Sequence, residues 1–206
     1  EIVIAPLAVE ALDYRQERGA LAELEKLLAE GDAVVFGEGE LAAGVPGQNR
    51  LRMEQARTLV FWTAPSSPAE VRAALAATQP ERVALFAVDP ELDRPDAFLR
   101  RLSGLVKHVL NQRGGRVTLA ELAAATAQRE TVALLGLRWL ASNGSIVVAE
   151  RPDGELVIGK GNGRPAEQNE RDLAAARLRA ALEETAAFRA YFKGAEKDAL
   201  LRGYFA

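Results

Sequence analysis

Residues 130–159, ETVALLGLRWLASNGSIVVAERPDGELVIG, determine the predicted fold of the middle of this chain. Apolar residues recur at helical spacing in the first half of the stretch, and Asn143-Gly144 is a typical helix end. Two short apolar runs then flank Pro152-Asp153-Gly154, which favours a β-hairpin. The stretch therefore predicts a helix followed by two strands. The residues expected on the buried side of the helix are Val132, Leu135, Trp139 and Leu140.

Two further helices are predicted upstream of this stretch. Apolar residues from Phe98 to Leu110 have helical spacing, and Gly114-Gly115 follows them. Thr118 with Glu121 three residues later is a capping box, which predicts the start of a short second helix. Three helices followed by a hairpin are the order of a winged helix-turn-helix, which we expect over residues 95–163.

The first part of the chain alternates strand-like and helix-like runs. Strand-like runs at 2–9, 33–39, 58–65 and 82–89 are separated by helical patterns, one of which has Ser67 as its N-cap and Pro68 in its first turn. Continuously apolar strands that alternate with helices predict a parallel sheet covered on both faces. We therefore expect an α/β section at 1–94, ending near the proline-rich and acidic DPELDRPDAF at 89–98.

The last part of the chain predicts a helical tail at 164–206. A polar linker precedes an alanine-rich helix expected from about 171 to about 189. Aromatic residues follow, and we expect them to pack back onto a domain: Phe188, Tyr191, Phe192, Tyr204 and Phe205. The predicted fold class is thus α/β, with a small parallel-sheet section, a winged helix and a C-terminal helical tail.

Composition limits the chemistry that the chain can perform. It has no cysteine and a single histidine, His108, which disfavours thiolate or histidine metal clusters and suits a reducing cytoplasm. No apolar run is long enough to span a membrane. The sequence begins without an initiator methionine or a signal peptide, which indicates a piece of a longer protein.

Charge is distributed unevenly along the chain. Residues 1–94 carry nine basic and sixteen acidic residues, whereas residues 95–163 carry nine basic and six acidic ones. The basic surface predicted for the winged helix comprises Arg100, Arg101, Lys107, Arg113, Arg116, Arg129, Arg138 and Arg151. Such a surface indicates contact with phosphates or with an acidic protein, or simply a solvated charged face. The third helix offers few side chains for reading bases, which disfavours sequence-specific binding.

Recognisable catalytic motifs are missing from the sequence. Neither glycine-rich nucleotide loop occurs, and Glu38 and Glu40 place negative charge in the segment that most resembles one. Asp89, Glu91 and Asp93 could bind a hard cation or could form a solvated loop. We interpret His108 as a surface histidine, and Ser66 and Ser67 as helix caps.

Five segments together resemble the C-terminal region of the RecJ family, the bacterial single-strand-specific 5′-to-3′ DNA exonucleases. They are ALDYRQERG (11–19), LVFWTAPSSPAEVRAAL (59–75), PERVALFAVDPE (80–91), the run from Phe98 to Val148, and RDLAAARLRAALEETAAFRAYFKG (171–194). The sequence departs from the family pattern at LGLRWLASNG (135–144), where members often carry an aromatic or acidic residue.

The resemblance implies that catalysis belongs to a nuclease core outside this chain. That core would hold Mn²⁺ or Mg²⁺ with paired aspartates and histidines, whereas this chain has no Asp-His-His triplet and no cofactor is expected in it. In the family, the region is taken to engage the acidic, aromatic-ended tail of the single-stranded DNA-binding protein, or a helicase or translocase. The partner-binding residues expected here are Arg100, Arg101, Lys107, Arg113, Arg116 and Arg138, with Trp139 supporting the core.

Two alternatives remain open from the sequence. One is direct, sequence-independent binding of single-stranded nucleic acid by the winged helix. The other is a catalytic α/β section that uses Asp13, Glu38 or Asp89.

Overall fold

The computed structural model describes residues 9–205, which form a mixed α/β protein. Packing divides the chain into two compact units. The first comprises Glu1–Pro90 with Phe188–Ala206, and the second comprises Glu91–Ala187. The helix α6 (Gln168–Gly194) contributes residues to both units. The boundaries expected near residues 94 and 163 remain predictions.

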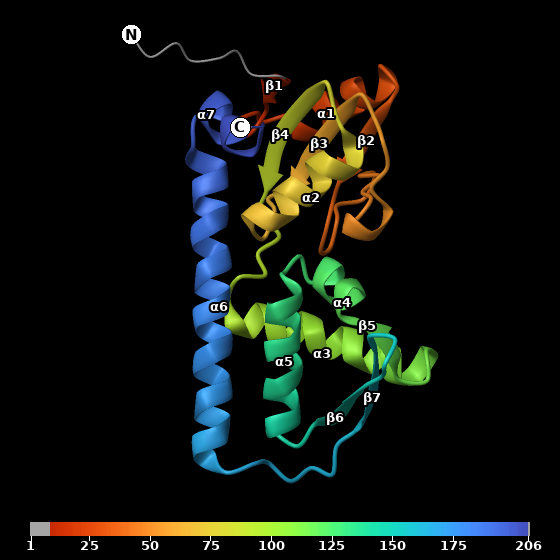
Figure 1. Cartoon of the computed structure of the whole chain (residues 1–206), viewed down its shortest axis with the longest axis vertical. Helices are drawn as coiled ribbons and strands as arrows, with labels where there is room; N and C mark the ends of the chain where they lie inside the picture. The colour runs from red at the N-terminus through yellow and green to blue at the C-terminus, as the bar shows by residue number, and fades with distance from the viewer. Residues whose placement is uncertain (1–8, 206) are drawn as a thin grey trace. The chain divides into compact units, whose positions relative to one another are not determined.

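The first unit is built on a four-stranded parallel sheet, as the sequence predicts (Figure 1). Its strands, in the order β1-β4-β3-β2, are β1 (Glu10–Asp13), β2 (Ala33–Phe36), β3 (Thr58–Thr63) and β4 (Arg82–Val88). The strand predicted at 2–9 lies almost wholly outside the described residues, and β1 begins after it. Its short sequence, EALD, has no run of β-branched residues and gave no strand signal.

Helices cover both faces of this sheet, so its central strands are buried on both sides. Leu24 and Leu27 of α1 (Ala20–Ala29) pack with Val60 and Trp62 on one face. On the other face, the side chains of α2 (Pro68–Thr78), the end of α6 and α7 (Lys197–Phe205) form a core around Phe61. The predicted coverage of both faces is therefore confirmed.

The ends of α2 follow the sequence signals. The Ser67 side chain accepts a hydrogen bond from the Glu70 backbone N–H, and Pro68 occupies the first turn. The helix ends at Gln79, whose φ of 47° is left-handed, just before Pro80. Ser66 is not a cap, because its buried hydroxyl has no hydrogen-bond partner among the described residues.

The second unit contains three complete helices, the first part of α6 and a three-stranded antiparallel sheet. Its elements are α3 (Pro95–Gln112), β5 (Arg116–Thr118), α4 (Leu119–Ala125), α5 (Glu130–Ser142), β6 (Ile146–Glu150) and β7 (Glu155–Lys160), followed by the first part of α6. The sheet order is β5-β7-β6. The predicted capping box is confirmed, since Thr118 and Glu121 exchange hydrogen bonds at the start of α4.

Close packing of α3 against α5 forms the centre of the second unit. Phe98 and Leu102 of α3 are fully buried, and a Cβ on Gly136 of α5 would lie only 2.5 Å from Leu102. Val132 and Leu140 are buried as predicted, but Leu135 and Trp139 are only half-buried. Leu137 and Ala133 are fully buried in their place, which rotates the buried face of α5 from the predicted one.

The helix α6 begins a few residues before its predicted start and continues past Arg189 to Gly194. Leu178 and Leu182 join the core of the second unit. Among the C-terminal aromatic residues, Phe192 is fully buried in the first unit, and Phe188 and Tyr204 are half-buried there. Tyr191 is 54% exposed and Phe205 36% exposed, so the predicted packing of the aromatic tail is only partly confirmed.

Candidate partner-binding surface

Three of the six predicted contact residues lie on α3. Arg100 and Lys107 are exposed and seven positions apart, so they fall on the same side of the helix. Arg101 is half-buried, and its Nε donates a hydrogen bond to the carbonyl of Ala125 at the end of α4, at 3.1 Å. Arg101 therefore helps to hold α4 against α3 and has less freedom to bind a partner.

Arg113 and Arg116 are exposed but form ion pairs within the second unit. Arg113 lies 2.9 Å from Glu121 of the capping box, and Arg116 lies 3.6 Å from Glu155 of β7. Surface pairs of this kind contribute little to stability, yet they partly neutralise both arginines. Glu155 also lies 3.4 Å from Arg151, so it is shared between two arginines.

The pKa of Glu121 is perturbed by this arrangement. Partial burial alone would raise the pKa of the carboxyl group, but hydrogen bonds from the Thr118 backbone and the Arg113 side chain outweigh it and lower the pKa. A carboxyl group whose pKa is lower in the folded state stabilises the fold above its unfolded pKa. That contribution is lost as the pH falls through the folded value.

We therefore expect the Glu121→Gln variant to lose less stability in acid than the wild type. The two proteins should differ most above about pH 4.3, the usual pKa of a glutamate, and converge as the pH falls below it. Urea unfolding at a series of pH values, followed by Trp139 fluorescence in a Trp62→Phe background, measures the stability of the second unit. Glu130→Gln, at the exposed start of α5, is the control. An equal pH response of the two variants would contradict the prediction.

Arg100, Lys107 and Arg138 are the most available of the six predicted cations. All three are exposed, and within residues 9–205 none of them has an ion pair or a side-chain hydrogen bond. They can therefore bind an external anion without first breaking an internal contact.

A groove in the second unit lies beside Lys107. It encloses about 400 Å³ and is lined by Ser103, Val106, Lys107, Leu110, Asn111, Leu140, Ser145, Ile146 and Lys160. Four apolar side chains form much of the lining, with one lysine from α3 and another from the end of β7. Arg100 lies one turn before Ser103 and extends the same side of α3.

Lys160 is the residue of this groove that the sequence analysis missed. Like Lys107, it is exposed and without an ion pair in the described part of the chain. In β7 it follows Leu156 and Ile158 on the inward-facing row of the strand, and its backbone pairs with Ile146. This alternation was the available signal, because it places Lys160 at the end of a buried row.

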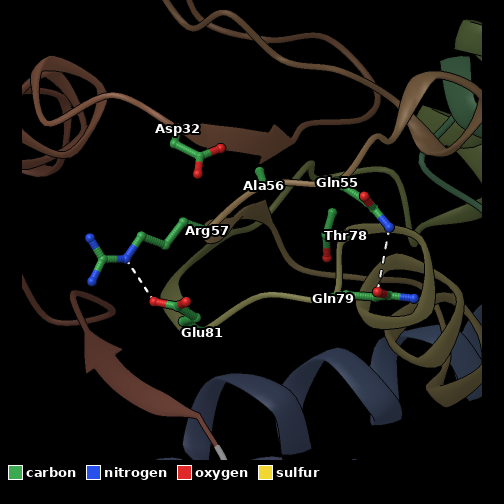
Figure 2. A pocket seen from close by; sticks show the side chains of 7 residues that line it. All are labelled: Asp32, Gln55, Ala56, Arg57, Thr78, Gln79 and Glu81. Atoms are coloured by element: carbon green, nitrogen blue, oxygen red, sulfur yellow. Dashed lines mark hydrogen bonds and ion pairs between the residues drawn. The ribbon is translucent and has the colours of Figure 1, made fainter.

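A second pocket, in the first unit, is polar and shallow. It encloses about 310 Å³ and is lined by Asp32, Gln55, Ala56, Arg57, Thr78, Gln79 and Glu81 (Figure 2). Its residues precede the strands β2, β3 and β4, and so lie at the amino ends of the sheet, whereas ligands of such sheets usually bind at the carboxyl ends. The Arg57–Glu81 pair that spans it is well exposed.

The carboxylates considered for catalysis are all engaged by cations. Asp13 forms a bidentate pair with Arg15, whose hydrogen bond lowers the pKa of Asp13 despite partial burial. Asp89 lies 3.4 Å from Lys193. Over residues 9–205 no three histidine, cysteine or acidic side chains are grouped so that they could hold a metal ion.

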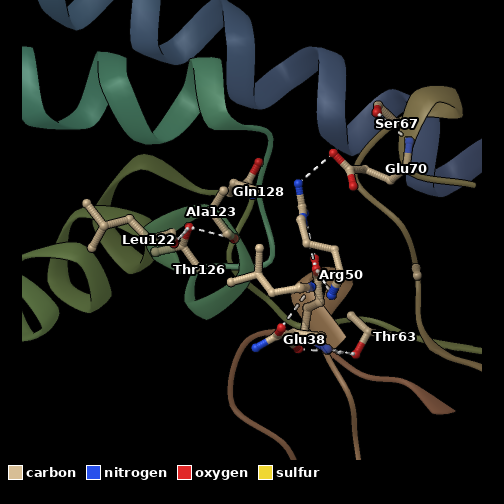
Figure 3. Close-up of polar contacts among 12 residues, drawn as sticks. Glu38, Arg50, Thr63, Ser67, Glu70, Leu122, Ala123, Thr126 and Gln128 are labelled. Carbon is tan, nitrogen blue, oxygen red and sulfur yellow. Dashed lines mark hydrogen bonds and ion pairs between the residues drawn. The ribbon is translucent and has the colours of Figure 1, made fainter. Parts of the chain in front are cut away.

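The most buried of these carboxylates is Glu38, whose side chain is only 1% exposed. Arg50 donates to both of its oxygens at 2.7 Å and also to Glu70 at the start of α2 (Figure 3). The backbone N–H of Glu38 donates to the Thr63 hydroxyl. This network fastens the 37–57 loop to the carboxyl end of the sheet, which is a structural role.

The same edge of the sheet is occupied by α6. Arg189 is 2% exposed, and its Nε donates a hydrogen bond to the carbonyl of Ala64, just after β3, at 3.0 Å. Arg15 similarly donates to the carbonyl of Phe192. Side chains of the chain itself thus fill part of the edge where a sheet of this kind would bind a ligand.

Comparison of the chain with protein-family models, curated proteins and solved structures finds no match. None of the helices described is both long and apolar enough to cross a membrane.

Proposed function

We propose that this chain is a non-catalytic, partner-binding region of a RecJ-like single-strand 5′-to-3′ DNA exonuclease. In this proposal it recruits the acidic tail of the single-stranded DNA-binding protein, or a helicase or translocase, during DNA repair in the cytoplasm. The metal ions and the hydrolysis belong to the nuclease core of the parent protein. The order α3, β5, α4, α5, β6, β7 is compatible with a winged helix, which supports the resemblance.

The groove beside Lys107 is the observation that carries the proposal. An acidic peptide with an apolar end needs cations next to an apolar slot, and the groove offers Lys107 and Lys160 next to Val106, Leu110 and Ile146. Its volume of about 400 Å³ lies within the usual range of ligand pockets. Arg100 and Arg138 add positive charge to the same unit and would accelerate association.

The test is binding of a fluorescent aspartate-rich peptide that ends in phenylalanine. We expect saturable binding that weakens as salt is added, and a loss of at least about tenfold in affinity after Lys107→Glu with Lys160→Glu, since two charge contacts become repulsive. Arg177→Glu with Arg179→Glu is the matched control, because it reverses two exposed charges of α6. An equal loss in both double variants would refute the role of the groove.

The same titration addresses direct nucleic-acid binding. The outward face of the hairpin carries Val147, Ala149 and Val157, which cannot neutralise phosphates. Arg116 lies opposite Val157 and Arg151 follows β6, but both arginines are paired with Glu155. We therefore expect a labelled single strand to bind more weakly than the peptide. Tight, steeply salt-dependent binding of the strand would favour the nucleic-acid function instead.

A further inference from the structure

The strand β6 has an open edge. It is the last strand in the order β5-β7-β6, and within the described residues its only strand partner is β7. Two backbone hydrogen bonds at the ends of the pairing show which residues of β6 bond to β7. Arg151 N–H donates to the carbonyl of Glu155, and Gly161 N–H donates to the carbonyl of Ser145. Antiparallel partners alternate between bonded and non-bonded pairs, so the odd-numbered residues of β6 bond to β7.

The backbone groups of Ile146, Val148 and Glu150 consequently point away from β7, toward the open edge. Natural edge strands are usually protected by a lysine, a proline or a bulge. The sequence of β6, IVVAE, contains no lysine or proline, its single charged residue is Glu150 at the end, and its pairing with β7 has no register shift. Val147 on the outward face is 58% exposed. The edge is therefore ready to accept another strand.

We propose that the occupant is β6 of a second copy of this chain, paired antiparallel about Val148. The two sheets then join into one continuous sheet with the order β5-β7-β6-β6-β7-β5. Outward-pointing backbone groups of Ile146, Val148 and Glu150 meet the same groups of the other copy, which allows about six new hydrogen bonds. On the outward face, Val147 of each copy lies opposite Ala149 of the other, so both such pairs are apolar.

Charge complementarity supports this register. Lys160 pairs with Ile146 in one copy, and Ile146 faces Glu150 of the second copy. Lys160 and that Glu150 thus lie in one row on the same face, two strand spacings or about 9.6 Å apart at Cα. Both are exposed and without an ion pair in the part of the chain that the structure covers. Their long side chains can approach each other along this row, and the two-fold symmetry makes this contact twice.

Sedimentation of the whole chain between about 1 μM and about 100 μM tests the pairing, because this range brackets a weak association. We expect the mass to rise from 22.2 kDa toward twice that value. Val147→Lys should keep the mass at that of one chain, because lysine on an edge opposes pairing. Leu173→Lys is the matched control, since Leu173 is 52% exposed on α6, and it should associate like the wild type.

Cysteine cross-linking tests the register, because the chain has no cysteine of its own. A Val148→Cys pair would lie about 5.5 Å apart at Cα, which suits a disulfide. Two Val147→Cys residues would be more than about 7 Å apart and should not cross-link. A single-chain mass at every concentration, equal association of both lysine variants, or equal cross-linking of both cysteine variants would overturn the proposal. Binding of the acidic peptide is measured separately for each variant.

Discussion

Replacing Gly115 with alanine is expected to destabilise the second unit far more than the same change at Gly114. Both glycines have positive φ, of 84° and 59° respectively, so alanine is strained at either position by about 1 kcal/mol. Only at Gly115 is the space also occupied, because a Cβ there would lie 2.2 Å from the carbonyl oxygen of Ile158. That contact is with backbone, and Ile158 N–H bonds to the Gly115 carbonyl, so the strand cannot easily move away.

We expect Gly115→Ala to cost about 3 kcal/mol or more and Gly114→Ala about 1 kcal/mol. Urea unfolding measures both when Trp139, which packs in the second unit, is the only tryptophan, in a Trp62→Phe background. Equal midpoints for the two alanine variants would show that the close approach of α3, β5 and β7 is not as described.

A comparably large effect is expected in the first unit when Arg50 is replaced by methionine. The change leaves the Glu38 carboxylate, which is 1% exposed, without its bidentate partner. An uncompensated buried charge costs about 3–5 kcal/mol.

Arg57→Met provides the control for this prediction. The Arg57–Glu81 pair has the same N···O distance, 2.7 Å, as Arg50–Glu38, but its side chains are 61% and 70% exposed. Its loss should cost at most about 1 kcal/mol. Adding Glu38→Gln to Arg50→Met should restore part of the stability, because the charge is removed with its partner. Unfolding followed by Trp62 in a Trp139→Phe background reads the first unit. Failure of the second change to restore stability would contradict the explanation.

Local signals in the sequence predicted much of the secondary structure. The parallel sheet follows from continuously apolar runs such as 58–63, the start of α2 from Ser67-Pro68, and the start of α4 from Thr118 with Glu121. Each signal involves residues within a few positions of one another, so backbone chemistry alone is enough to read it. The strand β1 was missed because four residues without β-branching carry no such signal.

The candidate surface was only partly predictable. Composition drew attention to the basic residues of 95–163, and Lys107 does line the groove. From the sequence, Lys107 could not be distinguished from Arg101, which bonds to Ala125, or from Arg113, which pairs with Glu121. Those contacts depend on how α3, α4 and β5 pack. It also missed Lys160, which reaches the groove only through the pairing of β7 with β6.

The sequence by itself therefore determined most of the helices and strands, several of their caps and the excess of positive charge in the middle of the chain. Tertiary structure alone decided which of those charges are available and which are engaged. It also buried Arg189 against Ala64, 125 positions away, and left the edge of β6 open. The physical reason is that secondary structure depends on interactions between near neighbours. The surroundings of a charge or a strand edge depend on segments that meet only after folding.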